Sequence, residues 1–335
     1  MEIKERRIYT LDDIAKELGV SKTTVSRAIS GKGRISKETR ERVQRFIQEN
    51  DYQPNAVAKG LAQKKTYNLA LVHPADYASI DFPFFRDCTN GICKMASRYN
   101  YDIIISMIDG EDLSPIHRLV LNRKVDGIIL SRATENSAAQ KYLKDSGMPY
   151  LVIGLCPDES TVSVDNKNQE ASQELTEIML MKGIRRIALF GGKESHNVTQ
   201  YRYQGFVRAH ERMKTAYDKE LIMMNVENQV KVLEAVQRAV KAKADGILCM
   251  DDFITDMTLS CLREKGIHIP EELKLASLYD SMQLENNIPS VTSVRFNTVK
   301  LGEYACFKLL KLLGEDMEQE EFQPGYQVIL RESTK

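Results

Sequence analysis

The sequence predicts an α/β protein in two unequal parts: a small all-α head and a larger core built on parallel sheets. Within residues 10–50, apolar side chains recur three and four positions apart, and polar residues stand where three helices would be capped. From residue 68 onward, short apolar runs alternate with amphipathic helical stretches. Apolar strands that alternate with helices are typical of a parallel sheet covered by helices on both faces.

Charge divides the chain at the same place. The 335 residues carry 47 basic and 47 acidic side chains. Residues 1–65 hold 15 of the basic and 9 of the acidic ones, a net charge of +6, which leaves −6 for the rest of the chain. A small basic head on an acidic core indicates that only the head meets a polyanion.

Three short helices are predicted in the head. Thr10 can cap the first, Ser21 the second and Ser36 the third, because short hydroxyl side chains accept hydrogen bonds from backbone N–H groups of the first turn. Gly19 ends the first helix at a position that favours glycine. The side chains expected to face inward are Leu11, Ile14, Ala15, Leu18, Val25, Ala28, Ile29, Thr39, Val43, Phe46 and Ile47.

The first two helices are joined by a tight turn over residues 18–21 and form a helix-turn-helix. In such a motif the second helix enters the major groove of DNA with its N-terminal end. Arg27 can donate two hydrogen bonds to guanine, a contact worth about 1–3 kcal/mol of discrimination between bases. On composition alone, a three-helix packing module with solvated charges is an equal alternative. The outward polar side chains of the second helix are Lys22, Thr23, Thr24, Ser26 and Arg27.

The core is predicted to contain eight strands with helices between most of them. The strands are Asn68–Val72, Tyr101–Ser106, Asp126–Leu130, Tyr150–Gly154, Arg186–Phe190, Glu220–Met223, Asp245–Cys249 and Lys274–Leu278, and the clearest helices are Phe84–Tyr99, Lys167–Lys182 and Gln229–Lys241. Residues 126–130 (DGIIL) are echoed at residues 245–249 (DGILC). This echo favours two similar lobes over one large sheet.

Motifs of other protein classes are missing from the sequence. The six cysteines form no CxxC pair and the five histidines no HExxH, so we expect free thiols in a reducing cytoplasm, with no metal and no other cofactor. The first residues are charged and lack the apolar run of a signal peptide, and the longest apolar runs are strand-sized. Neither GxGxxG after the first core strand, nor GxxxxGK[ST], nor GxSxG occurs, so we do not expect an enzyme.

Residues 11–66 resemble the N-terminus of LacI/GalR-family repressors. The resemblance rests on an ordered set of short matches: Asp13-Ile14-Ala15, Gly19-Val20-Ser21, Thr24-Val25-Ser26-Arg27, Ser36 with Glu38-Thr39-Arg40, and Tyr52 with Pro54-Asn55. It implies a DNA-binding domain over residues 1–53. It also implies base contacts from Lys22, Thr23 and Arg27, whereas Ser21, Thr24 and Asn55 would position the protein on the DNA backbone.

The same resemblance implies a short hinge helix at residues 55–63, within a hinge and linker over residues 54–65. Leu61 stands at the position of a leucine wedge that opens a central minor-groove step, and Ala58 is a further expected DNA contact. Nine residues cannot hold an isolated helix in water, so the hinge should order only with DNA and a partner hinge. Gly60 departs from the family pattern and lowers helix propensity by roughly 1 kcal/mol relative to alanine.

A looser resemblance to this family continues through residues 66–335, with matches such as residues 125–129 (VDGII), 164–166 (VDN) and Arg202-x-x-Gly205-Phe206. It implies a two-lobed, periplasmic-binding-protein-like core for effector binding and dimerisation. The first lobe is expected at residues 66–161 and 292–322, and the second at residues 162–291 and 323–335. Ligands of such sheets bind at the carboxyl ends of the strands. The implied effector contacts are Phe84, Ser131, Arg202, Asp251, Tyr279 and Asp280.

These contacts suit a polyol, because carboxylates accept hydrogen bonds from hydroxyl groups and a guanidinium donates them. Gly154 and Phe296 stand where related sugar sites often carry polar side chains, which makes this cleft less polar than a simple hexose site. We therefore expect a modified sugar, an oligosaccharide fragment or a sugar acid. Phe84 or Phe85 could instead stack on a purine ring, so a purine-responsive regulator of the same family is the alternative.

Taken together, the residues and the resemblance predict a cytoplasmic, homodimeric transcription regulator that recognises specific DNA sequences. We expect it to repress a carbohydrate-utilisation operon by binding double-stranded DNA at a palindromic operator, under the control of a small carbohydrate effector. An exported sugar-binding protein is a further alternative, which the basic head and the missing export signal disfavour.

Overall fold

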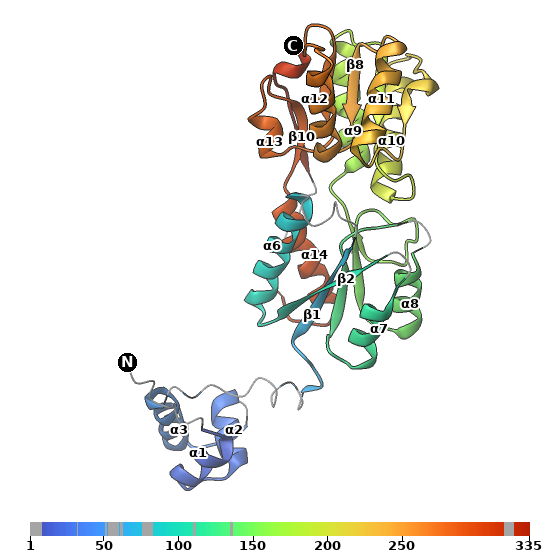
Figure 1. Cartoon of the computed structure of the whole chain (residues 1–335). Helices are drawn as coiled ribbons and strands as arrows, with labels where there is room; N and C mark the ends of the chain where they lie inside the picture. The colour runs from blue at the N-terminus through green and yellow to red at the C-terminus, as the bar shows by residue number, and fades with distance from the viewer. Residues whose placement is uncertain are drawn as a thin grey trace. The chain divides into compact units, whose positions relative to one another are not determined.

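The computed structural model of the chain describes residues 9–31, 33–50, 52, 60, 63–75, 83–109, 112–134, 137–317 and 325–335. The chain forms two compact units, Met1–Thr66 and Tyr67–Lys335 (Figure 1). The first unit is helical, and the second contains two separate sheets. The predicted class, a helical head followed by an α/β core, is therefore confirmed.

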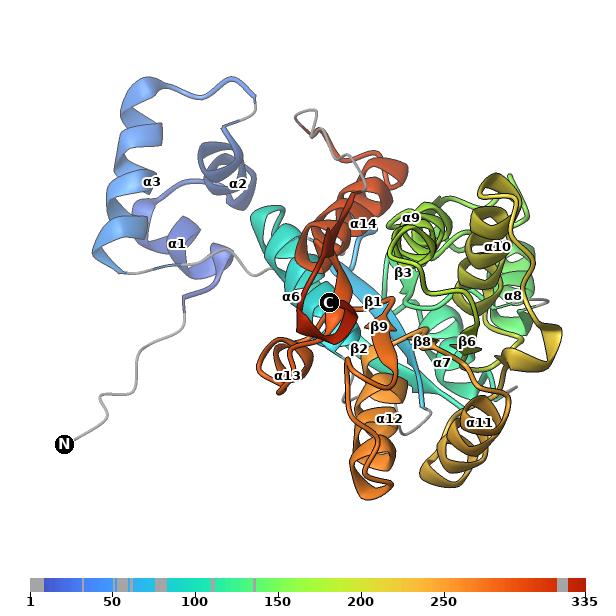
Figure 2. The same cartoon turned by 90° about the horizontal axis from the view of Figure 1, so that it is seen from above.

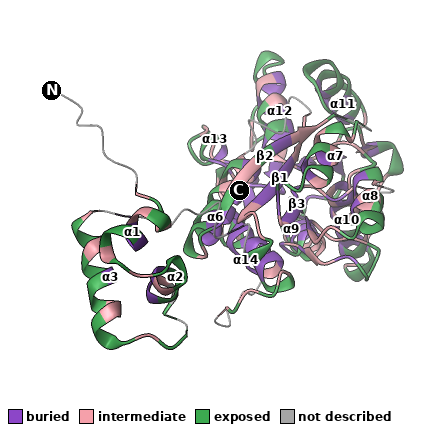
Figure 3. Ribbon diagram, turned by 90° about the horizontal axis from the view of Figure 1, so that it is seen from below, coloured by how far each residue is buried: buried purple, intermediate pink, exposed green. Residues whose placement is uncertain are grey.

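Three helices surround a small apolar core in the head: α1 (Leu11–Leu18), α2 (Lys22–Ser30) and α3 (Lys37–Glu49). Each begins at its predicted cap, since the hydroxyls of Thr10, Ser21 and Ser36 accept a hydrogen bond from the backbone N–H three residues later. Gly19 ends α1 with a φ of 64°, a backbone conformation that glycine adopts without strain. The inner faces are buried and the outer faces exposed (Figure 3), as the apolar spacing predicts.

The first lobe of the core is a parallel sheet in the order β2-β1-β3-β4-β5. Its strands are β1 (Asn68–Pro74), β2 (Asp102–Ile108), β3 (Gly127–Leu130), β4 (Tyr150–Ile153) and β5 (Ser163–Val164). Two helices pack on each face: α6 (Pro83–Arg98) and α14 (Thr298–Leu312) on one, and α7 (Ser114–Leu121) and α8 (Ala138–Ser146) on the other. α6 and α14 lie side by side in Figures 1 and 2.

The second lobe repeats this arrangement around a sheet in the order β11-β10-β9-β8-β6-β7. Its strands are β6 (Ile187–Phe190), β7 (Ile222–Met223), β8 (Gly246–Cys249), β9 (Lys274–Ser277), β10 (Thr292–Phe296) and β11 (Tyr326–Ile329). α9 (Asn168–Met181) and α10 (Asn197–Arg212) cover one face, and α11 (Gln229–Lys241) and α12 (Asp252–Glu264) the other. The short elements are α13 (Met282–Glu285) and the 3-10 turns at Lys219–Leu221 and Glu332–Thr334.

The strand pairing moves two of the predicted lobe boundaries. β5 pairs with β4 in the first lobe, although residue 162 was expected to begin the second. β10 pairs with β9 and β11 in the second lobe, although residue 292 was expected to return to the first. The sequence gives little signal at these places because β5 has two residues and β10 carries Thr, Ser and Arg. β10 and β11 are also antiparallel, the one exception to parallel pairing among the described strands.

Glycines allow two pairs of helices to touch backbone to backbone. A Cβ atom at Gly302 of α14 would lie 2.1 Å from the carbonyl oxygen of Cys88 on α6, and one at Gly91 would lie 2.0 Å from that of Val299. In the second lobe, a Cβ atom at Gly205 of α10 would lie 2.2 Å from the carbonyl oxygen of Gln169 on α9. Since the ends of α6, α9, α10 and α14 reach the space between the lobes, these contacts fix the walls of the site there.

Candidate DNA-binding helix and effector cleft

The turn between α1 and α2 is held by hydrogen bonds from both sides. The Val20 N–H donates to the Ala15 carbonyl at 3.0 Å, and Arg42 of α3 donates to the Leu18 carbonyl at 3.0 Å. The Ser21 hydroxyl accepts from the Thr24 N–H at 3.1 Å. Backbone groups at the facing ends of both helices are thereby satisfied, which fixes the direction of α2 relative to α1.

The outer face of α2 is polar and open. Lys22, Thr23 and Arg27 are exposed, whereas Val25 and Ala28 are buried against the head's own core. Lys22 forms an ion pair with Asp12 at 2.8 Å in which both side chains are 59% exposed, so exchanging this partner for a DNA phosphate costs little. The division between the two faces is the one that base reading requires.

The predicted head contacts divide into two groups. Ser21 caps α2, its first turn contains Lys22, Thr23 and Thr24, and its last turn contains Arg27. The hydroxyls of Ser21 and Thr24 lie 2.8 Å apart and form a hydrogen bond. These two residues therefore stabilise the start of α2, in addition to the predicted contacts with the DNA backbone. Asn55, Ala58 and Leu61, the predicted hinge contacts, lie outside the described residues.

Between the two lobes lies a cavity of about 150 Å³. This is roughly ten times the probe volume of about 15 Å³ that a single water needs, so the cavity is large enough for a small organic molecule. Residues that follow the carboxyl ends of β3, β4, β6, β8 and β9 contribute to its wall. The predicted contacts that line it are Phe84, Ser131, Arg202, Asp251 and Tyr279, and further lining groups include Arg132, Asp165, Asp252, His196 and Phe296.

Arg202 reaches the cavity from α10 and is 8% exposed. Its Nε donates to the Asn168 side-chain oxygen at 3.1 Å, and its Nη1 donates to the Met250 carbonyl. Burial lowers the pKa of this guanidinium, although nearby acids such as Asp251 oppose the shift. Within the described part of the chain Arg202 makes no ion pair, so two neutral acceptors, at the start of α9 and after the end of β8, hold it in place.

Two neighbouring carboxyl groups line the cavity beside Arg202. Asp251 caps α12, where it accepts a hydrogen bond from the Ile254 N–H at 2.8 Å, and burial raises its pKa. Asp252 is 8% exposed, and burial together with the adjacent Asp251 raises its pKa to about 7. Near neutral pH the pair therefore offers both hydrogen-bond acceptors and, on a fraction of molecules, a carboxylic acid donor.

Three aromatic rings form an apolar wall of the cleft. The Tyr279 and Phe296 rings are stacked with centroids 6.1 Å apart, and Phe84 meets Tyr279 edge-on at 6.3 Å. The Tyr279 hydroxyl lies 3.3 Å from the hydroxyl of Thr298, the first residue of α14. Because Tyr279 follows β9 in the second lobe and α14 packs on the first, this wall links the two lobes.

His73 supports the polar side of the cleft and was not predicted. Its Nδ1 lies 2.9 Å from the Ser131 hydroxyl and its Nε2 lies 3.2 Å from the Thr89 hydroxyl. Burial and the nearby Arg132 lower its pKa, so the ring is neutral at pH 7. One feature of the sequence could have indicated His73. It is a polar residue near the carboxyl end of β1, next to the carboxyl end of β3, where the other polar side chains of the site lie.

The lobes also touch each other at one edge of the cavity. Thr134 and His196 form an antiparallel bridge through their backbones, and the Asn197 side-chain amide donates to the Leu155 carbonyl at 2.9 Å. Thr134 and Leu155 belong to the first lobe, whereas His196 and Asn197 begin α10 in the second. One backbone bridge and one side-chain hydrogen bond therefore join the lobes at this edge of the cleft.

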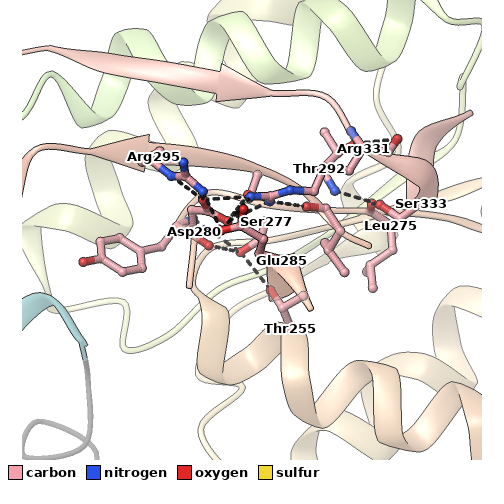
Figure 4. Close-up of polar contacts among 12 residues, drawn as sticks. Thr255, Leu275, Ser277, Asp280, Glu285, Thr292, Arg295, Arg331 and Ser333 are labelled. Carbon is pink, nitrogen blue, oxygen red and sulfur yellow. Dashed lines mark hydrogen bonds and ion pairs between the residues drawn. The ribbon is translucent and has the colours of Figure 1, made fainter. Parts of the chain in front are cut away.

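The structure corrects the prediction that Asp280 lines the effector cavity. Its carboxylate turns away from the lining and accepts hydrogen bonds from Arg331, Arg295 and Ser293 (Figure 4). Although burial opposes ionisation, these donors hold its pKa below the usual value. The cause of the error is a distant partner, since Asp280 pairs with Arg331 far along the chain while the preceding residue, Tyr279, lines the cavity.

Other features of the described residues are consistent with neither a metal site nor a membrane segment. No three His, Cys, Asp or Glu side chains among them are grouped so as to hold a metal ion. Their helices are too short or too polar for any of them to span a bilayer. The six cysteines are free thiols, and four of them are buried.

Comparisons with known proteins decide the family. Residues 10–55 match the model described as bacterial regulatory proteins of the lacI family, and residues 176–334 match that of a periplasmic binding protein-like domain. The HTH-type transcriptional regulator MalR of Streptococcus pneumoniae is 29% identical over 318 residues, which cover 93% of this chain and 95% of that protein. The chain belongs to the LacI family. This LacI-family protein is accordingly a DNA-binding transcription regulator and not an enzyme, as predicted.

Two solved structures share its fold over almost the whole length. The transcriptional regulator CelR in complex with cellobiose is 25% identical, with a TM-score of 0.73 over 97% of this chain and 99% of that one. The lac repressor dimer bound to operator and the anti-inducer ONPF gives a TM-score of 0.81 over 98% of this chain and 99% of that one. At 19% identity, the second likeness concerns the fold alone.

Proposed function

We propose that this LacI-family regulator is a repressor of a carbohydrate-utilisation operon, and that its effector is a sugar or sugar derivative bound in the cleft between the lobes. One observation carries the proposal: carboxyl groups and an aromatic wall line the same cavity. Sugar hydroxyls donate to carboxylates, and the apolar C–H faces of a sugar ring pack on aromatic rings. Asp251, Asp252, Tyr279 and Phe296 supply these two surfaces.

The similar proteins support a carbohydrate. CelR, which aligns over almost the entire chain, was solved with cellobiose. A purine ring would also find aromatic partners here, but the cavity offers it a surplus of acceptors and few side-chain amides for its polar edge. A carbohydrate ligand would therefore use more of the lining side chains than a purine would.

The DNA side of the proposal is a homodimer on a palindromic operator. Each head would present α2 to a major groove, with Lys22, Thr23 and Arg27 toward the bases. Two exposed apolar side chains beside and within α13, Met282 (75% exposed) and Ile288 (87%), support a second copy that covers them. A regulator that binds chromosomal DNA in this way would act in the cytoplasm.

The proposal is tested by selecting an operator from random DNA with the full chain and then measuring its affinity with and without a panel of sugars and nucleobases. We expect a palindromic site, and at least one carbohydrate that changes the operator affinity tenfold or more. Phe296→Ala should weaken this response by removing a wall ring. Phe253→Ala removes a 40% exposed ring on α12 that does not line the cavity, and it should leave the response intact. A response to nucleobases alone would contradict the carbohydrate assignment.

A further inference from the structure

We infer that the cleft selects a hydroxyl-rich effector that carries neither a phosphate nor a carboxylate group. This inference rests on the proposed function and narrows its ligand class. The acidic groups of the lining carry it: three carboxyl side chains, Asp165, Asp251 and Asp252, share one cavity with two guanidinium groups, Arg132 and Arg202, and one imidazole, His196. A ligand anion would enter a site that already holds more carboxyl than guanidinium groups.

Both guanidinium groups are already engaged by the protein. The Nε of Arg202 donates a hydrogen bond to the Asn168 side chain, and its Nη1 donates one to the Met250 carbonyl. The Arg202 side chain is buried. The Arg132 guanidinium lies over the Phe85 ring, 5.2 Å from its centroid. A guanidinium has five N–H donors, so these contacts leave further donors on both groups, and a neutral hydroxyl can accept from them as well as an anion can.

Helix N-termini commonly bind anions, and three of those at the cleft, at the starts of α9, α10 and α12, are occupied as well. Asp165 accepts from the Asn168 N–H at 3.1 Å at the start of α9, and Asp251 accepts from the Ile254 N–H at the start of α12. At the start of α10, the Asn197 N–H is directed to the Ala133 carbonyl at 3.4 Å. The protein's own carboxylates thus take the places that a ligand anion would fill.

A neutral polyol meets none of these obstacles. Its hydroxyls can donate to Asp165, Asp251 and Asp252, and no further negative charge is added to the closely spaced carboxyl pair. The apolar wall of Phe84, Tyr279 and Phe296 would contact the uncharged face of the same molecule. The lining therefore complements the hydroxyls of a sugar and repels its acidic derivatives.

Binding of matched ligand pairs to the full chain tests the inference. Isothermal titration would compare neutral mono- and disaccharides, such as glucose and cellobiose, with glucose 6-phosphate, glucuronate and phosphorylated cellobiose. We expect the best neutral sugar to bind at least tenfold more tightly than its charged counterpart. A charged sugar that binds as tightly as the neutral one, or more tightly, overturns the inference and leaves the proposed function in place. If no carbohydrate binds, the proposed function falls, and the inference with it.

A variant that removes one cleft carboxylate tests whether the carboxyl groups cause the preference for neutral sugars. Asp252→Asn keeps the shape of the side chain, and we expect it to reduce the preference for the neutral sugar at least threefold. Asp256→Asn removes an exposed carboxylate from the same helix, outside the cavity lining, and should leave the preference unchanged. An unchanged preference in Asp252→Asn, with the folded state verified by circular dichroism, would contradict the role given to the cleft carboxyl groups.

Discussion

Asp280 and Arg331, 51 residues apart in the chain, form a two-pronged ion pair with N–O distances of 2.7 and 3.1 Å (Figure 4). Their side chains are 3% and 9% exposed. Arg331 also donates to the Val291 carbonyl and to the Ser293 hydroxyl, which in turn donates to Asp280. Since Asp280 directly follows the cleft residue Tyr279, this pair ties the C-terminal segment to the aromatic wall of the effector site.

We predict that Arg331→Ala lowers the free energy of unfolding by about 3–5 kcal/mol, because it leaves the Asp280 carboxylate buried without its principal partner. Urea unfolding followed by circular dichroism would measure the loss. Arg238→Ala is the matched control, since that arginine pairs with Glu220 on the surface and both side chains are at least 49% exposed. The control should change stability by less than about 1 kcal/mol. If both variants lowered the free energy of unfolding by the same amount, the buried pair would stabilise the fold no more than the exposed pair does.

Gly302→Ala tests the close contact between α14 and α6. We expect it to destabilise the core by roughly 1–3 kcal/mol or more, because the added Cβ would meet the Cys88 backbone and neither helix can move without disturbing the other. The gain in helix propensity, about 1 kcal/mol, acts in the opposite direction. Thermal unfolding measures the balance. Ser97→Ala, at an exposed position on α6, should stay within about 0.5 kcal/mol of the parent, and a stabilised Gly302→Ala protein would contradict the contact.

The sequence predicted those elements whose signal is local. The caps formed by Thr10, Ser21 and Ser36 were predictable because a cap requires only one hydroxyl and the backbone N–H three residues later. Strands such as β3 and β8 were visible because burial on both faces demands continuous apolar residues. β5 and β11 were not predicted. β5 has only two residues and β11 lies at the edge of its sheet, so neither strand requires a continuous run of apolar residues.

The effector site shows the same limit. Strand ends predicted which residues come near the cavity, and Phe84, Ser131, Arg202, Asp251 and Tyr279 do line it. The direction of a side chain beyond a strand end depends on partners far away in the chain. Asp280 turns to Arg331, which no local pattern around residue 280 could reveal.

Arg27→Ala tests base reading by α2. We predict a loss of about 1–3 kcal/mol, or roughly 5- to 150-fold, in binding to the selected operator, with salt-sensitive binding to random DNA largely retained. Gel-shift titrations at several salt concentrations would measure both. Arg45→Ala removes an exposed charge from α3 and should weaken operator and random DNA alike, if it acts at all. The base-reading role is excluded by a loss in Arg27→Ala that is equal on operator and random DNA.

Asp252 gives the core a pH dependence of definite sign. Its pKa is about 7 in the folded chain against an ordinary value of 3.8, so between these values the folded state binds more protons than the unfolded state. The stability it contributes is complete below pH 4 and is lost as the pH rises through 7. Each pKa unit of the shift corresponds to about 1.4 kcal/mol.

Asp252→Asn removes this titration and should flatten the decline of unfolding free energy between pH 4 and 7 relative to the parent chain. The comparison between the two proteins cancels the contributions of His73 and other groups outside the site, whereas the adjacent Asp251 also loses a charged neighbour in the variant. Asp256→Asn, exposed on the same helix, should keep the parent profile. Should the parent and Asp252→Asn profiles run parallel across that range, the Asp252 carboxyl would have to titrate at an ordinary pKa, and its place as a partly protonated donor in the cleft would be wrong.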